Sequence, residues 1–272
     1  MKLIDFDALF DKKLAQYMEE NKDKYSERQW EDVIPKLYKK FGDTFVAKVG
    51  CTPKEYYGKM TDGELAQTLA AHLKEDVPVP EFLCAEMESR DCVELMLPLL
   101  DSDDESTVSY ALHIIGVDAR AYDKYFNILV EERIGKELQD EVTEVFKYAA
   151  DDVKDRAYTY FTENKAKEYM LEILSRVKGK EERIFKALLD AFLREEDKIP
   201  MHASYLAAYG DERALPHLYQ KIQDESIGFV QFQELKYAIE ALGGEYNEPR
   251  DFSADKDYVA VEGASNLERN LS

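Results

Sequence analysis

The residues whose spacing most resembles a metal site are the acids of the segment 101–105, which reads Asp-Ser-Asp-Asp-Glu. Carboxylates at alternate positions of a loop are how calcium sites of the EF-hand type begin. Such a loop also needs a glycine at its sixth position and a glutamate at its twelfth. This chain has Ser106 and Leu112 there. The segment is therefore predicted to be a turn between helices, with an acid that caps the following helix.

Histidine and cysteine do not occur at metal-ligand spacing. The four histidines stand apart in the sequence, at His72, His113, His202 and His217. The three cysteines form no paired pattern and are expected to be reduced thiols: Cys51, Cys84 and Cys92. No Walker loop, G-x-S-x-G motif or dinucleotide-binding glycine motif occurs. We therefore predict no catalytic residue, no cofactor and no metal site.

Tyrosine is the one unusual enrichment, with 18 residues. Its side chain combines apolar area with a hydroxyl group and is favoured where proteins meet. If the chain forms a groove, exposed tyrosines and acids on the second helix of each helix pair are expected to line it. The candidate partner-binding residues are Glu105, Glu137, Asp140, Glu141, Glu144, Tyr148, Glu168, Tyr169, Tyr205, Glu234 and Tyr237. The alternative is that the tyrosines lie at the edge of the core and the acids on solvated helix faces.

These candidates lie on amphipathic helices that come in pairs, most clearly between Tyr205 and Gly244. The first helix of that pair, 213–223, has its apolar residues on one face, at Leu215, Leu218 and Ile222. The second, 229–242, has a similar stripe of Phe232, Leu235, Ile239 and Leu242. The glycine pair 243–244 can adopt the left-handed conformation that closes a helix.

The same plan recurs upstream. The segment 110–116 (YALHIIG) corresponds to 237–243 (YAIEALG), and LPLL at 97–100 corresponds to LPHL at 215–218. Helices that start near Cys92, Ala121, Asp152, Glu181 and Arg213 are separated by 29, 31, 29 and 32 residues. A nearly constant period indicates stacked repeats, because no single pair can bury its apolar stripes alone. The alternative is an unrelated run of helices of similar length.

The run Gly-Asp-Glu-Arg-Ala-Leu-Pro at 210–216 and the closing Ala-Leu-Gly at 241–243 resemble HEAT-like repeats, particularly the short bacterial kind. The resemblance covers 91–244, but the middle three units lack the proline and the closing glycine. It implies an all-α fold, an α-α superhelix in the form of a right-handed solenoid, used mostly for binding. It implies no particular partner.

Three segments are expected along the chain. Residues 1–90 form an N-terminal helical cap that ends after the helix-breaking run 77–80 (Val-Pro-Val-Pro). Its second helix starts after Ser26, and Pro35 is expected to bend or divide it. Residues 91–244 hold five pairs: 92–100 with 105–115, 122–133 with 137–149, 153–162 with 165–177, 181–194 with 200–209, and 213–223 with 229–242. Residues 245–272 form a tail, either mobile or docked through Phe252, Tyr258 and Val259.

The acidic charge limits the possible partners. The formal net charge is −21, and residues 1–90 hold 14 Lys and Arg against 18 Asp and Glu, so most of the excess lies in 91–272. Such a surface repels nucleic-acid backbones and anionic membranes and attracts basic partners. No stretch reaches the roughly 18 apolar residues of a membrane-spanning helix, and the N-terminus does not resemble a signal peptide. With reduced cysteines, a cytoplasmic protein is expected.

We therefore predict a non-enzymatic protein whose helical stack binds a protein or peptide, which could be basic. The second hypothesis is an acidic inhibitor or immunity-type protein that neutralises a basic partner such as a nuclease by presenting phosphate-like charge. The third is an enzyme on a HEAT-like scaffold. Relatives in that family act on tetrapyrrole chromophores or damaged DNA, but no residue constellation in this chain supports such an activity.

Overall fold

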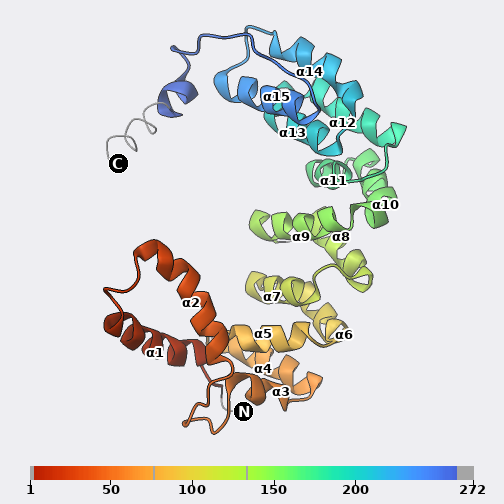
Figure 1. Cartoon of the computed structure of the whole chain (residues 1–272). Coiled ribbons are helices and arrows are strands. Elements are labelled where there is room, and N and C mark those ends of the chain that lie inside the picture. Colours follow the sequence, from red (N-terminus) through yellow and green to blue (C-terminus); the bar gives the residue numbers. More distant parts are fainter. Residues whose placement is uncertain (1–2, 76, 133, 262–272) are drawn as a thin grey trace. The chain divides into compact units, whose positions relative to one another are not determined.

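The computed structural model describes residues 3–75, 77–132 and 134–261 (Figure 1). Across these ranges the chain is helical, and the one extended pairing in them is an isolated bridge between Val46 and Cys51. The prediction of an all-α fold is confirmed. No described helix is both long and apolar enough to cross a bilayer. The chain divides into two compact units, Met1–Val142 and Thr143–Ser272.

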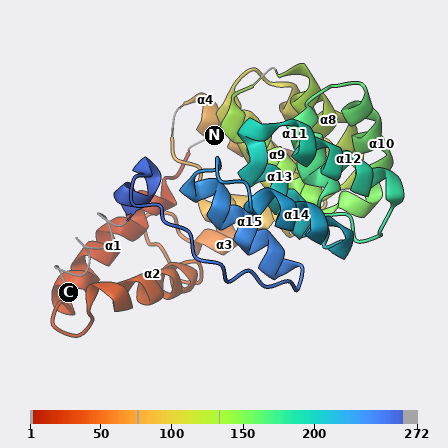
Figure 2. The same cartoon turned by 90° about the horizontal axis from the view of Figure 1, so that it is seen from above.

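The first unit begins with a helical hairpin of α1 and α2 (Figure 2). The Tyr38 hydroxyl of α2 donates a hydrogen bond of 2.6 Å to the Asp7 carboxylate of α1. The elements of this unit are α1 (Phe6–Glu20), α2 (Glu27–Phe41), α3 (Pro53–Gly58), α4 (Asp62–Lys74), α5 (Glu81–Glu88), α6 (Val93–Met96), the 3-10 segment η1 (Leu97–Asp101), α7 (Glu105–Ile115), η2 (Ala119–Ala121), α8 (Tyr122–Glu131) and the first part of α9 (Lys136–Tyr148).

Capping residues determine where several of these helices begin. At the starts of α3 and α4, Thr52 and Thr61 each accept a hydrogen bond from the backbone three residues later, and Glu55 and Glu64 reach back to the cap. Each pair satisfies two backbone N–H groups that the helix itself leaves unpaired. In the predicted turn at 101–105, Asp104 caps α7 by accepting from the Thr107 N–H at 2.9 Å.

Pro35 does not divide α2, which is continuous from Glu27 to Phe41. A proline inside a helix removes one backbone hydrogen bond. Trp30 and Phe41, on either side of it, are both buried. This burial explains why the helix continues through Pro35.

The predicted boundary after residue 90 lies inside the first unit. The Arg90 guanidinium donates to the Glu86 carboxylate and to the backbone carbonyls of Gly58 and Met60. In addition, α5 packs against α7, so a helix of the predicted cap and a helix of the first predicted pair share one core.

The second unit contains the remaining pairs. Its second helices, α11, α13 and α15, pack side by side in that order (Figure 1). Its elements are the last part of α9, α10 (Ala150–Thr162), α11 (Lys167–Leu174), α12 (Glu182–Arg194), η3 (Glu196–Lys198), α13 (Ile199–Tyr209), η4 (Glu212–Ala214), α14 (Leu215–Ile222), α15 (Phe229–Ala241) and a helical turn at 256–261. Helical segments lie at all the positions predicted for the five pairs, with bounds that differ from the predicted ones by a few residues.

Arginines tie successive pairs together at the period of the predicted repeat. In the first unit Arg120 donates to Asp91, 29 residues earlier. In the second, Arg183 donates to Asp155 and Arg213 donates to Glu182, at separations of 28 and 31 residues. Each arginine also pairs with an acid two residues before it, namely Asp118, Glu181 and Asp211. We call this arrangement the acid-x-Arg clasp. In each clasp the arginine reaches back to an acid at or near the first helix of the preceding pair.

Candidate functional site

Five of the predicted partner-binding residues form one exposed row on α9. The positions Glu137, Asp140, Glu141, Glu144 and Tyr148 are all exposed, and Tyr148 is 85% exposed. Residues three, four, seven and eleven apart share one helix face, so the row extends about 16 Å along the helix. We call it the α9 stripe.

Two predicted acids also hold helices together in the first unit. Glu105 accepts a hydrogen bond of 2.6 Å from the Gly135 N–H, and Glu141 accepts one of 3.0 Å from the Ser109 hydroxyl. A Cβ atom at Gly135 would lie 2.7 Å from the Glu105 carboxylate oxygen, so a larger residue there would make the end of the Glu105 side chain shift. These two carboxylates therefore link α7 to α9 and the residues before it.

Glu168 belongs to an ion network that joins α11 to α13. It accepts hydrogen bonds from Lys198 Nζ at 2.8 Å and from His202 Nε2 at 3.0 Å. Burial works to raise the pKa of Glu168, but the bonds from His202 and Lys198 outweigh it and lower that pKa. Nearby, hydrogen bonds from Lys167 and Lys198 lower the pKa of Glu195 to about 2.

Within this network Glu168, Glu195 and His202 each offer a ligand atom, all within 4.8 Å of one another. However, Lys198 already bridges the two carboxylates, so a metal cation would have to displace an ammonium group. The second ring nitrogen of His202 is buried and has no hydrogen-bond partner among the described residues. A metal-binding histidine normally donates from that nitrogen to an orienting partner. We therefore interpret the network as structural.

The remaining candidates differ in exposure. Tyr237 on α15 is 59% exposed, and Glu234, almost one turn earlier, is half-buried. Tyr169 is half-buried as well. Tyr205 is only 8% exposed, so the expectation that it faces a partner is wrong. Tyr205 lies on α13, which packs against α11, α12 and α15.

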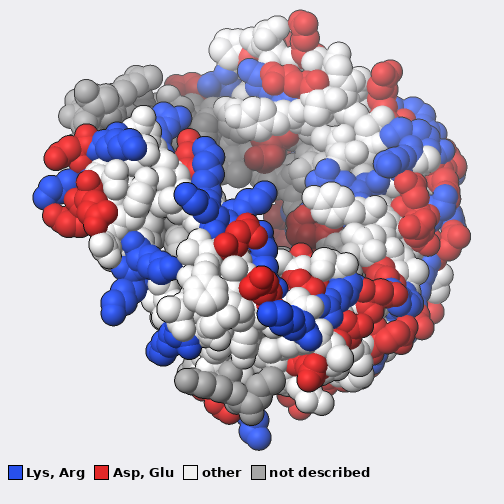
Figure 3. All heavy atoms as spheres, turned by 60° about the horizontal axis from the view of Figure 1, so that its bottom comes forward, with Lys and Arg blue, Asp and Glu red and all other residues white. Residues whose placement is uncertain are grey.

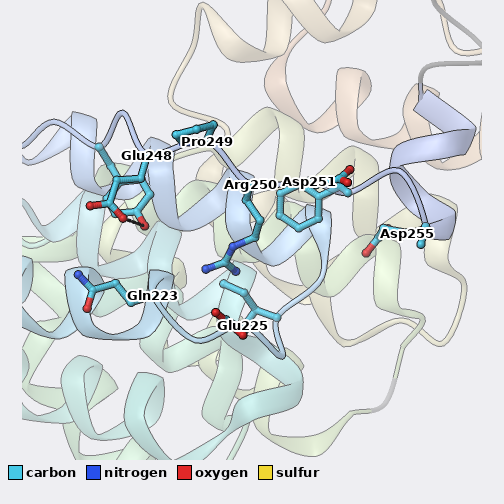
Figure 4. A pocket seen from close by; sticks show the side chains of 11 residues that line it. Gln223, Glu225, Glu248, Pro249, Arg250, Asp251 and Asp255 are labelled. Carbon is cyan, nitrogen blue, oxygen red and sulfur yellow. Dashed lines mark hydrogen bonds between the residues drawn. The ribbon is translucent and has the colours of Figure 1, made fainter.

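A cavity that was not predicted lies between the turn after α14 and the C-terminal segment 245–261 (Figure 4). Its volume is about 670 Å³. We call it the C-terminal cavity. It is lined by Gln223, Glu225, Ile227, Tyr246, Glu248, Pro249, Arg250, Asp251, Phe252, Ala254 and Asp255. Four of these residues are carboxylates and one is a cation, so the lining is acidic.

The cavity exists because the tail docks on α15. The Phe252 ring lies 5.4 Å from that of Phe229 and 5.1 Å from that of Phe232, and Tyr258 lies 5.1 Å from Phe229. The prediction of docking through Phe252 and Tyr258 is confirmed. Val259, which follows Tyr258 on the short helical turn, is 53% exposed and forms no comparable contact among the described residues.

Arg250 fastens this segment to the end of α14. Its guanidinium donates to the carbonyls of Ile222 at 2.6 Å and Asp224 at 2.9 Å, and it lies 4.9 Å from the Phe232 ring. The last carbonyls of a helix lack partners within the helix and carry the negative end of its dipole. In Figure 4 the side chain points from the tail towards this helix end. Its charge is therefore engaged with the backbone.

Two acids of the lining cap turns. Asp251 accepts from the Ser253 N–H at 2.9 Å, and Asp255 accepts from the Phe229 N–H at 3.0 Å. These backbone hydrogen bonds lower the pKa of both carboxyl groups, which are therefore ionised at neutral pH. Because these carboxylates already accept backbone hydrogen bonds, they have fewer free acceptor positions for a ligand.

The other two acids of the lining are available to a ligand. Glu225 has no hydrogen bond or ion pair with any described residue, and Glu248 accepts one bond of 3.3 Å from the Tyr246 hydroxyl. Beside them lie the apolar surfaces of Ile227 and Phe252. Two carboxylates next to an apolar wall suit a cationic side chain with a long apolar stem, as in lysine and arginine.

The buried thiols are poorly suited to catalysis. Burial raises the pKa of Cys84 to about 11, and it raises the pKa of Cys92 as well. Because the thiolate is the reactive form, both side chains are poor nucleophiles at neutral pH.

No protein-family model, curated protein or solved structure matches this chain. Its function therefore has to be inferred from its own geometry and chemistry.

Proposed function

We propose that the protein is a non-enzymatic module that binds a basic protein or peptide. The observation that carries this proposal is the C-terminal cavity, where Glu225 and Glu248 are available beside apolar walls. Its volume of about 670 Å³ falls in the range of roughly 300–1,000 Å³ that ligand sites occupy. A lysine or arginine side chain would place its charge between the carboxylates and its stem against Tyr246 and Phe252.

The proposal includes HEAT-like repeats as the scaffold, wound into a right-handed superhelix. It is supported by the helices at the predicted positions and by clasps that span 28 to 31 residues. The three cysteines are free, which supports a reducing compartment such as the cytoplasm.

Long-range electrostatics support the choice of a basic partner. A net charge of −21 attracts cationic molecules and raises their association rate. Salt screens this attraction over a Debye length of about 10 Å at 0.1 M ionic strength. The association rate should therefore fall with salt, while apolar contacts within the cavity should persist.

The test is a binding titration with fluorescent peptides rich in lysine or arginine, at about 0.05 M and about 0.5 M salt. The variant Glu225→Gln/Glu248→Gln should bind about tenfold more weakly at low salt. The control Glu131→Gln/Glu212→Gln makes the same charge change at two exposed positions outside the cavity. Equal weakening by both variants would show a general charge effect and refute the cavity as the binding site.

The α9 stripe favours a second function, that of an inhibitor which presents an array of carboxylates to a basic enzyme. Glu137 and Asp140 have no ion pair or hydrogen bond through their side chains with described residues, so their charge is open to a partner. The variant Glu137→Gln/Asp140→Asn/Glu144→Gln tests this function against a panel of basic nucleases. Loss of inhibition in this variant, with inhibition retained in the cavity variant, would favour the inhibitor.

A further inference from the structure

The first unit carries a surface of opposite character between α1 and α2. A cavity of about 170 Å³ lies there. Its floor is apolar and consists of residues spaced four apart on each helix: Phe10 and Leu14 from α1, Leu37 and Phe41 from α2. Such spacing places the residues of each helix on one face of that helix. We call this the α1–α2 groove.

Two lysines flank this floor, and neither is neutralised. Lys13 Nζ lies 5.1 Å from the centre of the Phe41 ring. Neither Lys13 nor Lys40 forms an ion pair through its side chain with a described residue, and both are exposed. An apolar floor between two such cations is complementary to an apolar group flanked by carboxylates.

The distribution of charge along the chain agrees with an acidic ligand at this place. Residues 1–60 contain 12 Lys and Arg against 11 Asp and Glu, whereas the remaining residues contain 24 against 46. Lys and Arg side chains gather over α1 and α2 in the left part of Figure 3. An acidic molecule would be repelled by most of this chain but not by the hairpin.

The size of the cavity decides between a small molecule and a segment of a larger partner. A cavity of roughly 150 Å³ holds one benzene, whereas sites for whole small molecules occupy roughly 300–1,000 Å³. At about 170 Å³, the α1–α2 groove has room for one aromatic or branched side chain. A neighbouring apolar cavity of about 560 Å³ shares Phe10 and could contact adjacent residues of the same segment.

We propose that the α1–α2 groove docks an acidic segment of a partner protein. One apolar side chain of that segment enters the cavity, and carboxylates on either side of it bind Lys13 and Lys40. This mode corresponds to the docking of an amphipathic peptide in a groove. The site is separate from the C-terminal cavity and does not depend on a basic partner.

The only tryptophan of the chain reports on this site. The Trp30 ring lies 6.2 Å from that of Tyr17, and Tyr17 lines the cavity. The probes are short synthetic peptides with one Phe, Leu or Trp anchor flanked by glutamates. Binding of the Phe and Leu peptides is followed by Trp30 fluorescence. Binding of the Trp peptide is followed by calorimetry, because its own fluorescence would interfere. Titration should change Trp30 emission to saturation. Peptides with the anchor replaced by alanine, or the glutamates by glutamine, should bind about tenfold more weakly.

Protein variants separate the groove from general charge. Lys13→Gln/Lys40→Gln should weaken peptide binding about fivefold, as expected for two exposed ion pairs. The control Lys12→Gln/Lys36→Gln changes the same charge on the same helices at positions that line neither cavity, and its affinity should stay within about twofold. All four lysines are exposed, so both variants should fold, and circular dichroism would verify this.

Four results would overturn the proposal. The proposal fails if none of the peptides binds, or if the control variant loses as much affinity as the groove variant. If 3-phenylpropionate binds as tightly as the peptides, the groove is a site for small aromatic carboxylates. If sedimentation shows self-association that disappears in the groove variant, its occupant is a second copy of this chain.

Discussion

Replacing Arg250 with methionine should release the C-terminal segment from the second unit. Methionine keeps the apolar stem of the side chain and removes both hydrogen bonds, those to the carbonyls of Ile222 and Asp224. A hydrogen bond from a charged group contributes about 1.5–3 kcal/mol, and the lower figure applies because Arg250 is half-buried. The two bonds together therefore stabilise the docked segment by about 3 kcal/mol, which corresponds to about 150-fold in the opening equilibrium.

Hydrogen exchange followed by mass spectrometry measures this opening directly. Amides in 245–261, such as that of Val259, which donates to the Asp255 carbonyl, should exchange about 100-fold faster in Arg250→Met. Exchange in α11 should not change. The control Arg194→Met removes an exposed arginine whose ion pair with Asp190 is also exposed, so the cost should be below about 0.5 kcal/mol.

Two results would refute this reasoning. If exchange in 245–261 rises less than about threefold, the hydrogen bonds of Arg250 do not hold the segment. If hydrogen exchange in α11 increases by the same factor as in 245–261, the substitution destabilises the whole second unit and not the docked segment alone. Because the segment forms one wall of the C-terminal cavity, Arg250→Met should also weaken the binding of basic peptides.

Three further predictions concern stability and reactivity. The pKa of Glu195 is lowered from 4.5 to about 2, so its ion pairs stabilise the fold fully above about pH 4.5 and are lost as the pH falls towards 2. The free energy of unfolding in urea should therefore depend less on pH for Glu195→Gln than for the wild type in that window. Equal pH dependence of the two proteins would contradict this prediction. Gly116 has φ 58° and ψ −136°, so Gly116→Ala should lower the free energy of unfolding in urea by about 1–3 kcal/mol. The control Gly63→Ala, in the first turn of α4, should be neutral or stabilising by up to about 1 kcal/mol. Similar effects of the two substitutions would contradict the backbone conformation assigned to Gly116. A thiol reagent at neutral pH should modify the half-buried Cys51 quickly and the two buried cysteines only after unfolding, and three equally fast thiols would contradict their burial.

Much of the fold could be predicted because its signals are local. The range 105–115 was predicted as a helix and is α7, since the acid at its start and the glycine after its end act within one turn. Capping boxes at Thr52 and Thr61 act over the same short distance. Helical periodicity also identified the buried face of α15, where Phe232, Leu235 and Ile239 are all buried.

Features that depend on contacts between distant residues could not be predicted in this way. Periodicity placed Tyr205 on the second helix of a pair but did not show that its side chain is buried, on a helix that packs against three others. The C-terminal cavity was missed because Arg250 acts across 26 to 28 residues, on carbonyls that no sequence pattern identifies. One signal was present: Arg250 is the single basic residue in the segment 237–255, which contains several acids.

Helix α9 is common to both units, since the division between Val142 and Thr143 falls near its middle. Val142 and Phe146, one on each side of that division, are fully buried. If the two units were expressed as separate fragments, each would contain only half of this 13-residue helix. A helix of that length is too short to form by itself in water. Thermal unfolding of one unit would also unfold its part of α9, a helix to which the other unit contributes as well. Scanning calorimetry should therefore record one merged endotherm, and the halves should be hard to produce as independent fragments.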